Sequence, residues 1–220
     1  MSKEAKAWLA EFSGTYALVF FGCGSIVIND AHDGPLGHLG ISIVFGLIVL
    51  VMIKTYGELS GAHFNPAVTV AFWVAGLFPA PRIPGYMLFQ LLGAIAAGYS
   101  LLLFYPEHPN LGATFAKTGQ WLPAFAMEFI LSFFLMLVIL HVATGSKLQR
   151  SYAAVAIGMT VLLEAAVGGP LSGASMNPAR SIGPALAAGF YTDLWIYIAA
   201  PILGAACSVL SWKITKHLDT

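Results

Sequence analysis

Two short stretches of this sequence decide its fold, because one nearly repeats the other. SGAHFNPAV occupies residues 60–68 and SGASMNPAR occupies residues 172–180, and six of the nine positions are identical. Each stretch leads into a short apolar segment, residues 65–76 and 177–189. A bilayer core needs about 20 apolar residues per helix, so segments of about half that length are typical of re-entrant pieces. Asn is a strong N-cap and Pro suits the first helical turn, so we expect each segment to be a short helix that begins at its Asn.

The composition of the whole chain describes a membrane protein. Of the 220 residues, 58% are hydrophobic and 9% are charged, and the mean hydropathy is +0.81. A soluble domain carries about 25% charged residues, so a soluble globular protein is excluded, and so is a disordered one. The net charge is zero, without the basic block that nucleic-acid binding requires. Cys23 and Cys207 lie in apolar segments, and no CxxC motif or nucleophile–base pair is visible, so we expect no metal, no cofactor and no enzyme activity.

Six apolar stretches have the length of a membrane-spanning helix. They are residues 7–28, 38–56, 83–104, 122–143, 152–171 and 194–214. Eight of the ten lysines and arginines fall in the termini and loops of one side if these helices alternate across the membrane. By the positive-inside rule, both termini are then cytoplasmic.

The repeat extends beyond the two short stretches. AEF at residues 10–12 returns as MEF at residues 127–129, at an offset close to that of the longer motif. We expect a single domain over residues 1–220, built from a first repeat (1–110) and a second repeat (111–220). Each repeat contains three spanning helices, an odd number, so the two must insert with opposite orientation. The predicted fold is an all-α membrane protein with six transmembrane helices and two re-entrant half-helices, whose N-termini meet near the bilayer midplane.

Further residues carry a resemblance to a known family. Two Asn-Pro-Ala motifs stand at equivalent repeat positions, the second is followed by Arg180, and Glu11 and Glu128 lie in the first and fourth spanning helices. This combination resembles the aquaporin, or major intrinsic protein, family over nearly the whole chain. GCGSIVIN at residues 22–29 and GPLSGASMNPARSIGPA at residues 169–185 resemble the nodulin-like branch, which includes carriers of glycerol and of neutral metalloid acids. The motif residues are Asn65, Pro66, Ala67, Asn177, Pro178 and Ala179.

The resemblance implies passive, energy-free conduction of water or small neutral solutes. It also implies a homotetramer in the membrane lipid, with one pore in each subunit and no role for nucleic acid. The chain lacks long plant-type tails, so we expect a bacterial or archaeal plasma membrane.

The pore itself can be outlined from the residues. Irregular backbone is tolerated at membrane depth only where it lines a cavity, so the runs before the two Asn-Pro-Ala motifs are expected to present backbone carbonyls to the pore. The Asn65 and Asn177 side chains are expected to donate hydrogen bonds to water at its centre, and the positive half-helix ends and Arg180 to oppose protons and cations. The expected carbonyl ladder comprises Gly61, Ala62, His63, Phe64, Gly173 and Ser175.

The family pattern also locates a selectivity filter. Its four contributors are Arg180, Phe45 (20 residues before Asn65), Ala165 and Ala174 (12 and three residues before the second motif Asn). Strict water channels of the family commonly carry His where this chain has Ala165. One aromatic ring, two methyl groups and one cation predict a wider and more apolar filter that passes small polyols or undissociated acids. Other positions resemble water channels, so a strict water channel stays an open alternative.

Three buried acids remain to be assigned. We expect Glu11 and Glu128 to support the re-entrant segments by accepting hydrogen bonds from their backbone. Glu164 has two open interpretations: it supports the second segment as well, or it reaches the pore mouth and changes selectivity. The same three acids are the candidate coupling sites if the chain is instead a secondary transporter with a midplane site. A junctional protein with the same fold is a further alternative.

Overall fold

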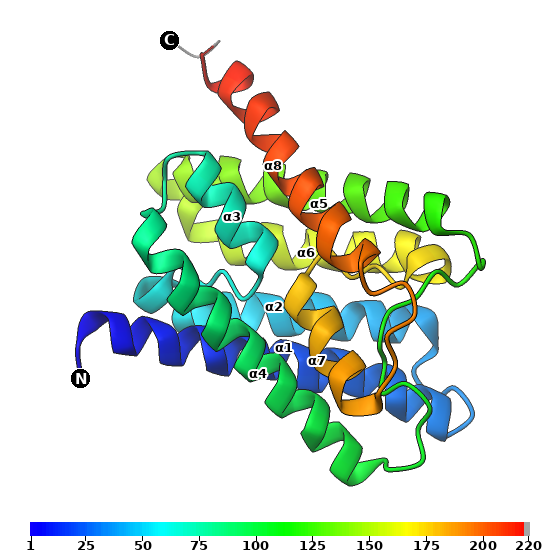
Figure 1. The fold of residues 1–220 in the computed structure, drawn as a ribbon. Coiled ribbons are helices and arrows are strands. Elements are labelled where there is room, and N and C mark those ends of the chain that lie inside the picture. Colours follow the sequence, from blue (N-terminus) through cyan, green and yellow to red (C-terminus); the bar gives the residue numbers. More distant parts are fainter. Residues whose placement is uncertain (218–220) are drawn as a thin grey trace.

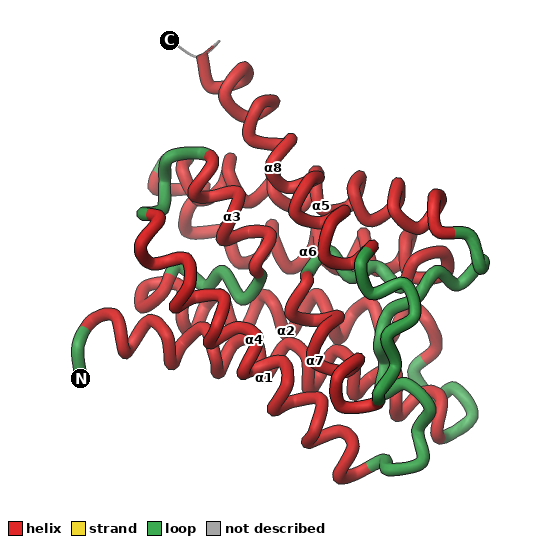
Figure 2. The backbone as a smooth tube through the Cα atoms, viewed as in Figure 1, coloured by secondary structure: helices red, strands yellow, loops and turns green. Residues whose placement is uncertain are grey.

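The structure, a computed structural model, describes residues 1–217, and every regular element in this part of the chain is helical (Figures 1 and 2). Six of the helices are long and apolar enough to cross a membrane, which confirms the predicted fold class. The long helices are α1 (Lys3–Ala31), α2 (Gly37–Ser60), α4 (Ile83–Phe104), α5 (Trp121–Thr144), α6 (Lys147–Ser172) and α8 (Ile196–His217). The short helices are α3 (Pro66–Val74), α7 (Pro178–Ala188) and the 3-10 turn η1 (Ala80–Arg82).

Two of the long helices begin earlier than their apolar stretches predict, because polar caps extend them. The Ser2 hydroxyl accepts a hydrogen bond from the backbone N–H of Ala5 (3.1 Å) at the start of α1. At the start of α6, Ser146 and Gln149 form a capping box, in which each side chain satisfies a backbone N–H of the other residue. Hydropathy detects the part of a helix that lies in lipid, whereas the caps decide where the helix begins.

The two half-helices start where the sequence predicts. The Asn65 side chain caps α3 by accepting a hydrogen bond from the Ala67 N–H (2.9 Å). The Asn177 side chain caps α7 in the same way, from the Ala179 N–H (3.0 Å). The starts of α3 and α7 approach each other near the centre of the molecule (Figure 1), and loop segments lead into both from α2 and α6 (Figure 2).

The long helices pack in the same pattern within each half of the chain. α1 packs on α4 and on α2, and α5 packs on α8 and on α6, while α2 and α6 join the two halves. The contact between α2 and α6 depends on Gly46 and Gly158. A Cβ at Gly46 would lie 2.6 Å from the Gly158 carbonyl oxygen, and a Cβ at Gly158 would lie 2.7 Å from that of Gly46. Gly46 and Gly158 are therefore close-packing sites, where α2 and α6 approach each other without intervening side chains.

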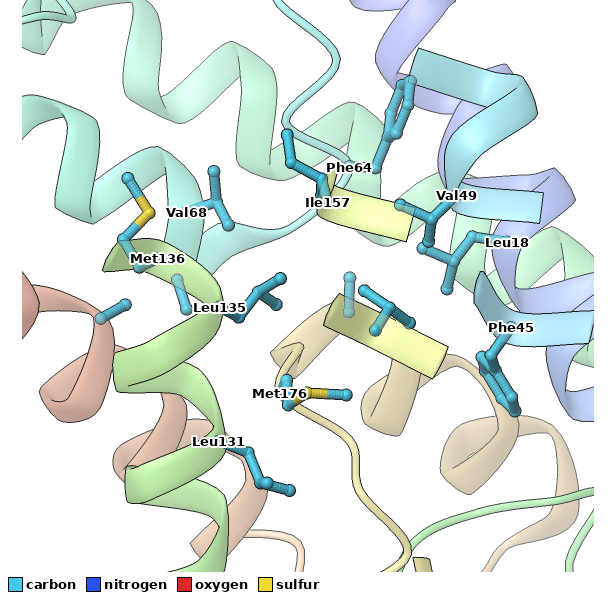
Figure 3. Close-up of a cluster of buried hydrophobic side chains, with 14 of the residues drawn as sticks. Leu18, Phe45, Val49, Phe64, Val68, Leu131, Leu135, Met136, Ile157 and Met176 are labelled. Atoms are coloured by element: carbon cyan, nitrogen blue, oxygen red, sulfur yellow. The ribbon is translucent and has the colours of Figure 1, made fainter. Parts of the chain in front are cut away.

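The buried side chains surround a central space. Leu18 of α1, Val49 of α2, Leu135 of α5 and Ile157 of α6 point toward it (Figure 3), and all four also line a cavity. The outer faces of the long helices carry exposed leucine, valine and phenylalanine side chains, as expected for surfaces that meet lipid. The core is thus the wall of a central cavity.

A candidate pore

Two cavities lie end to end through this core. The first cavity has a volume of about 290 Å³ and extends from Arg150, at the start of α6, to Arg180. The second cavity has a volume of about 300 Å³ and is walled by the α1–α2 connection and by residues of the segment between α4 and α5. Four residues line both cavities, so they surround the place where the cavities meet: Phe45, Ala165, Ala174 and Arg180. These are the four residues that the sequence predicts for a filter.

Arg180 is the only charged member of this group, and only part of its guanidinium is hydrogen-bonded among the described residues. The side chain is 1% exposed. Its Nη1 donates to the Gly112 carbonyl (2.7 Å), and its guanidinium carbon lies 5.1 Å from the centre of the Phe45 ring. Its Nε and Nη2 have no hydrogen-bond partner among the described residues. A permeating molecule with an oxygen acceptor can satisfy those two donors.

The two motif asparagines tie the re-entrant segments together at the centre. The Asn65 Nδ2 donates to the Met176 carbonyl (2.7 Å), and the Asn177 Nδ2 donates to the Phe64 carbonyl (2.8 Å). A side-chain amide has two N–H donors, so one donor per asparagine remains for water. The sequence predicts that the asparagines cap the half-helices and donate to water at the pore centre. The structure adds that each asparagine also binds the opposite segment, and that the Phe64 carbonyl of the expected ladder accepts one of these bonds.

The residues of the expected carbonyl ladder lie along both cavities. Gly61, Ala62, His63, Phe64 and Ser175 line the first cavity, and Gly173 lines the second. Every second residue of these segments has a left-handed backbone conformation. The positive φ angles lie at matching positions of both segments, at Ala62, Phe64, Ala174 and Met176. L-residues rarely adopt this conformation, so the segments need support from outside.

Glu11 and Glu128 contact the backbone of these segments. Both side chains are fully buried. Glu11 accepts from the backbone N–H groups of His63 (3.0 Å) and Phe64 (2.7 Å). Glu128 accepts from the equivalent N–H groups of Ser175 (2.9 Å) and Met176 (2.8 Å). Each carboxylate therefore satisfies two backbone donors that have no helical partner.

Glu164 does not support the second segment, contrary to the expectation. It is 8% exposed, lines neither cavity, and neither of its carboxylate oxygens has a hydrogen-bond partner among the described residues. The physical reason is that Glu128 already accepts from both segment N–H groups, and from the Ser172 hydroxyl as well (2.7 Å). The alternative, that Glu164 reaches the pore mouth, is not observed either.

Several contributing residues escaped the sequence analysis. The Gln90 amide donates to Glu11 (2.8 Å) and to the Thr69 hydroxyl (3.0 Å). The Tyr86 hydroxyl donates to the Ser60 carbonyl (2.7 Å), and the Tyr197 hydroxyl makes the equivalent bond at the end of α6. The repeat offset could have paired the two tyrosines. No sequence signal predicts that the carbonyl of Gly112, 68 residues away, receives Arg180.

Within residues 1–217, no group of three or more His, Cys, Asp or Glu side chains is placed to hold a metal ion. The arrangement consists of hydrogen-bond donors and acceptors along a mostly apolar wall. Such a site can bind and release small polar molecules one after another.

Comparisons with known proteins agree with this geometry. The sequence model of the family described as "Major intrinsic protein" matches residues 1–212. The chain is 46% identical to Nodulin-26 of Glycine max over 212 residues, which cover 96% of this chain and 78% of that protein. It is 44% identical to Aquaporin NIP1-1 of Zea mays over 212 residues, with 96% and 75% covered. The solved structure of the aquaglyceroporin from Plasmodium falciparum superposes with a TM-score of 0.87 at 25% identity, over 98% of this chain and 99% of that one.

These matches confirm the resemblance to the nodulin-like branch. Nodulin-26 and the maize aquaporin are plant proteins, so they give no support to the expected bacterial or archaeal origin. Since the family model and the plant relatives cover nearly the whole sequence, the chain belongs to the major intrinsic protein family.

Proposed function

We propose that this chain is an integral membrane channel that conducts water and small neutral solutes down their gradients. The observation that carries the proposal is the pair of cavities that meet at four residues deep in the helix bundle. The relatives support it, because two of them are named as aquaporins or an aquaglyceroporin. Those relatives are channels and not enzymes, and a channel needs no catalytic group.

The centre of the pore is suited to water and unsuited to protons. Each motif asparagine keeps one N–H for the water oxygen after it has bonded the opposite segment. Two donors to one oxygen orient that water and interrupt a continuous donor–acceptor chain. Each half-helix N-terminus adds about half a positive elementary charge. Positive helix ends and the Arg180 guanidinium oppose cations, so the pore selects for neutral molecules.

The filter composition favours solutes larger than water. We assign the filter to Phe45, Ala165, Ala174 and Arg180, whose shared position between the cavities supports the assignment. Two methyl groups leave space beside the aromatic ring, and the unpartnered Arg180 donors offer hydrogen bonds to a hydroxyl oxygen. Glycerol and undissociated metalloid acids have this combination of small size, neutrality and hydroxyl groups.

The assembly and orientation complete the proposal. Both termini face the cytoplasm, so the first cavity opens inward through Arg150 and the second opens outward. Residues 1–110 and 111–220 are the two inverted repeats of one channel domain. The subunits form a homotetramer, in which part of the exposed apolar surface of the long helices is covered by neighbouring subunits.

Stopped-flow light scattering on proteoliposomes tests the function. An impermeant osmolyte is expected to shrink the vesicles faster than protein-free ones, without any ion gradient. Two variants on α6 provide matched controls: Val161→Trp fills the first cavity, whereas Leu163→Trp places the same side chain at a position that is 61% exposed. Val161→Trp is expected to abolish the accelerated shrinkage and Leu163→Trp to retain it. Equal rates in both variants, or a flux that requires an ion gradient, would favour a transporter over a channel.

A further inference from the structure

A proline lies inside the last turn of α6. Proline has no backbone N–H, so Pro170 cannot donate the helical hydrogen bond to the carbonyl of Ala166, four residues earlier. A carbonyl freed in this way at membrane depth needs another donor, which a neighbouring helix can supply. Ala166 directly follows Ala165 of the proposed filter, so the donor that satisfies this carbonyl acts next to the filter.

The donor comes from His38, in the first turn of α2. Its Nε2 lies 2.8 Å from the Ala166 carbonyl oxygen. A carbonyl oxygen can only accept, so Nε2 is the ring nitrogen that carries the hydrogen. The two residues are 128 positions apart in the chain, and the hydrogen bond therefore joins two different long helices.

The His38 ring occupies a space that Gly169 keeps open. A Cβ at Gly169 would lie 2.5 Å from Cε1 of this ring, so a larger residue at this position would displace the ring. Gly169 and Pro170 act together, because the glycine admits the ring and the proline leaves the carbonyl free. Both His38 and Gly169 line the second cavity.

The hydrogen bond connects the two long helices that carry residues of the proposed filter. Phe45 follows His38 by seven residues on α2, which is just under two turns, so both side chains lie on the same face of the helix. Both also line the second cavity. On α6, Ala165 adjoins the residue whose carbonyl accepts the bond. The bond therefore holds α2 and α6 together on the outer side of the filter, and the close glycine contact between these helices is the other fixed point.

The first repeat is built differently at the matching place. The spacing of the two motifs, which begin at residues 60 and 172, pairs Pro170 with Glu58, a residue that keeps its backbone N–H. The same spacing pairs His38 with Arg150, and Arg150 donates to the nearby Gly145 carbonyl (3.3 Å). The cross-helix bond of His38 therefore belongs to the second cavity, next to the proposed filter.

We propose that His38 is a positioning residue for the filter, which clamps α2 to α6 through the carbonyl that Pro170 leaves free. The clamp sets the separation of Phe45 and Ala165, and so the size of the solute that passes. This inference rests on the proposed channel function and adds a determinant of solute size outside the four filter residues. Without the clamp, the ends of α2 and α6 separate, and larger solutes pass faster.

NMR of the ¹⁵N-histidine-labelled protein tests the hydrogen bond independently of transport. The ring N–H of an exposed, unbonded histidine exchanges with water too fast to be seen at neutral pH, whereas a bonded one gives a resolved signal. One such signal is expected to be absent in His38→Gln and retained in His32→Gln, a control that removes an exposed histidine at the end of α1. If the two variants give the same ring N–H signals, His38 is not bonded and the proposal is wrong.

Permeability supplies the second readout, as the ratio of erythritol to glycerol re-swelling rates of proteoliposomes. His38→Ala removes the donor and is expected to raise this ratio severalfold. His38→Gln keeps a side-chain N–H at a similar reach and is expected to stay close to the wild type. His32→Ala is the matched control and is expected to leave the ratio unchanged. Equal ratios in His38→Ala and His38→Gln would contradict the positioning role.

Pro170→Ala tests whether the clamp acts through the Ala166 carbonyl. This variant has a backbone N–H at residue 170, so α6 can satisfy that carbonyl itself. His38→Ala is then expected to change the ratio much less in the Pro170→Ala background than in the wild type, because two residues that act on one group are not additive. The same change in both backgrounds would mean that His38 acts by another route, and would overturn the proposal.

The readouts remain separable if one of them fails. If Pro170→Ala does not fold, the comparison of His38→Ala with His38→Gln still decides. If the wild type conducts neither water nor polyols, the proposed function fails, while the NMR comparison still reports on the clamp.

Discussion

Replacing Arg180 by valine should let cations pass through the channel while the fold and the water permeability are kept. The guanidinium is the single charge among the four residues that line both cavities. It is held by the Gly112 carbonyl on one side and by the Phe45 ring on the other, so it cannot swing out of the passage. Arg180→Lys is the matched control, because lysine keeps the charge and loses the fork of donors.

The size of the effect follows from Coulomb's law. The guanidinium lines the place where the cavities meet, so a cation that passes alongside it comes within about 5 Å of the charge, which is the contact distance of two small ions. Two unit charges about 5 Å apart repel by about 3 kcal/mol at an effective dielectric constant of about 20. Since every 1.4 kcal/mol is about a factor of ten, Arg180→Val should raise the cation flux about two orders of magnitude above that of Arg180→Lys.

The assay combines two measurements on the same proteoliposomes. A pH-sensitive dye inside the vesicles reports proton leak, and stopped-flow shrinkage reports water permeability. Arg180→Val is expected to leak protons while water permeability stays within a few-fold of the wild type. If Arg180→Val and Arg180→Lys leak equally little, the charge barrier resides at the half-helix N-termini instead, and the assignment of the barrier to Arg180 is wrong.

Three further predictions concern stability and titration. Glu11→Leu leaves three buried donors without an acceptor, and each unsatisfied donor costs about 1–3 kcal/mol of stability. Its thermal unfolding, followed by size-exclusion chromatography, should therefore occur at a much lower temperature than that of Glu11→Gln. Equal unfolding temperatures would contradict the supporting role of Glu11. Gly93→Ala places a Cβ against the backbone carbonyl of α1 and should cost about 1–3 kcal/mol, whereas Gly57→Ala, with its nearest neighbour 3.9 Å away, should be nearly neutral in the same assay. Loss of hydration, followed by the charge of the filter arginine, lowers the pKa of Lys117. NMR of the ¹³C-dimethylated protein should therefore show Lys117 losing its proton at a lower pH in the folded protein than in the unfolded protein. Between these two pKa values the unfolded chain holds more protons, so this group adds stability as the pH rises; coincident titrations of Lys117 in the folded and unfolded protein would refute the shift.

The sequence predicts the architecture well because the constraint is strong and local. A bilayer requires spans of about 20 apolar residues, and an Asn-Pro pair starts a helix. Six spans and two half-helices follow from these two rules. The starts of α1 and α6 do not follow from hydropathy, because Ser2 and Ser146 place them in polar sequence. The motif around Ser146 was readable as a capping box, whereas a serine next to the first residue gives little signal.

The candidate site was predictable where the repeat or the family pattern specifies it. The four residues between the cavities come from such a pattern. The cross-bonds of Asn65 and Asn177 to the opposite segments do not, since they depend on how closely two half-helices meet. Glu164 lies next to Ala165, which suggested a role for it in the second segment. The structure shows no hydrogen-bond partner for its carboxylate among the described residues, and no local sequence pattern encodes the helix packing that decides this.

The most direct test of the whole account is the ratio of glycerol to water permeability in the wild type and in Ala165→His. We attribute solute permeability to the space beside the methyl group of Ala165, a residue that lines both cavities and is 7% exposed. An imidazole at this position fills that space and adds a polar group. Osmotic shrinkage should stay fast in both proteins, and rapid re-swelling in a glycerol gradient should occur in the wild type and be lost in Ala165→His. A wild type that shrinks quickly and does not re-swell would contradict the account, because the filter would then be closed to everything larger than water.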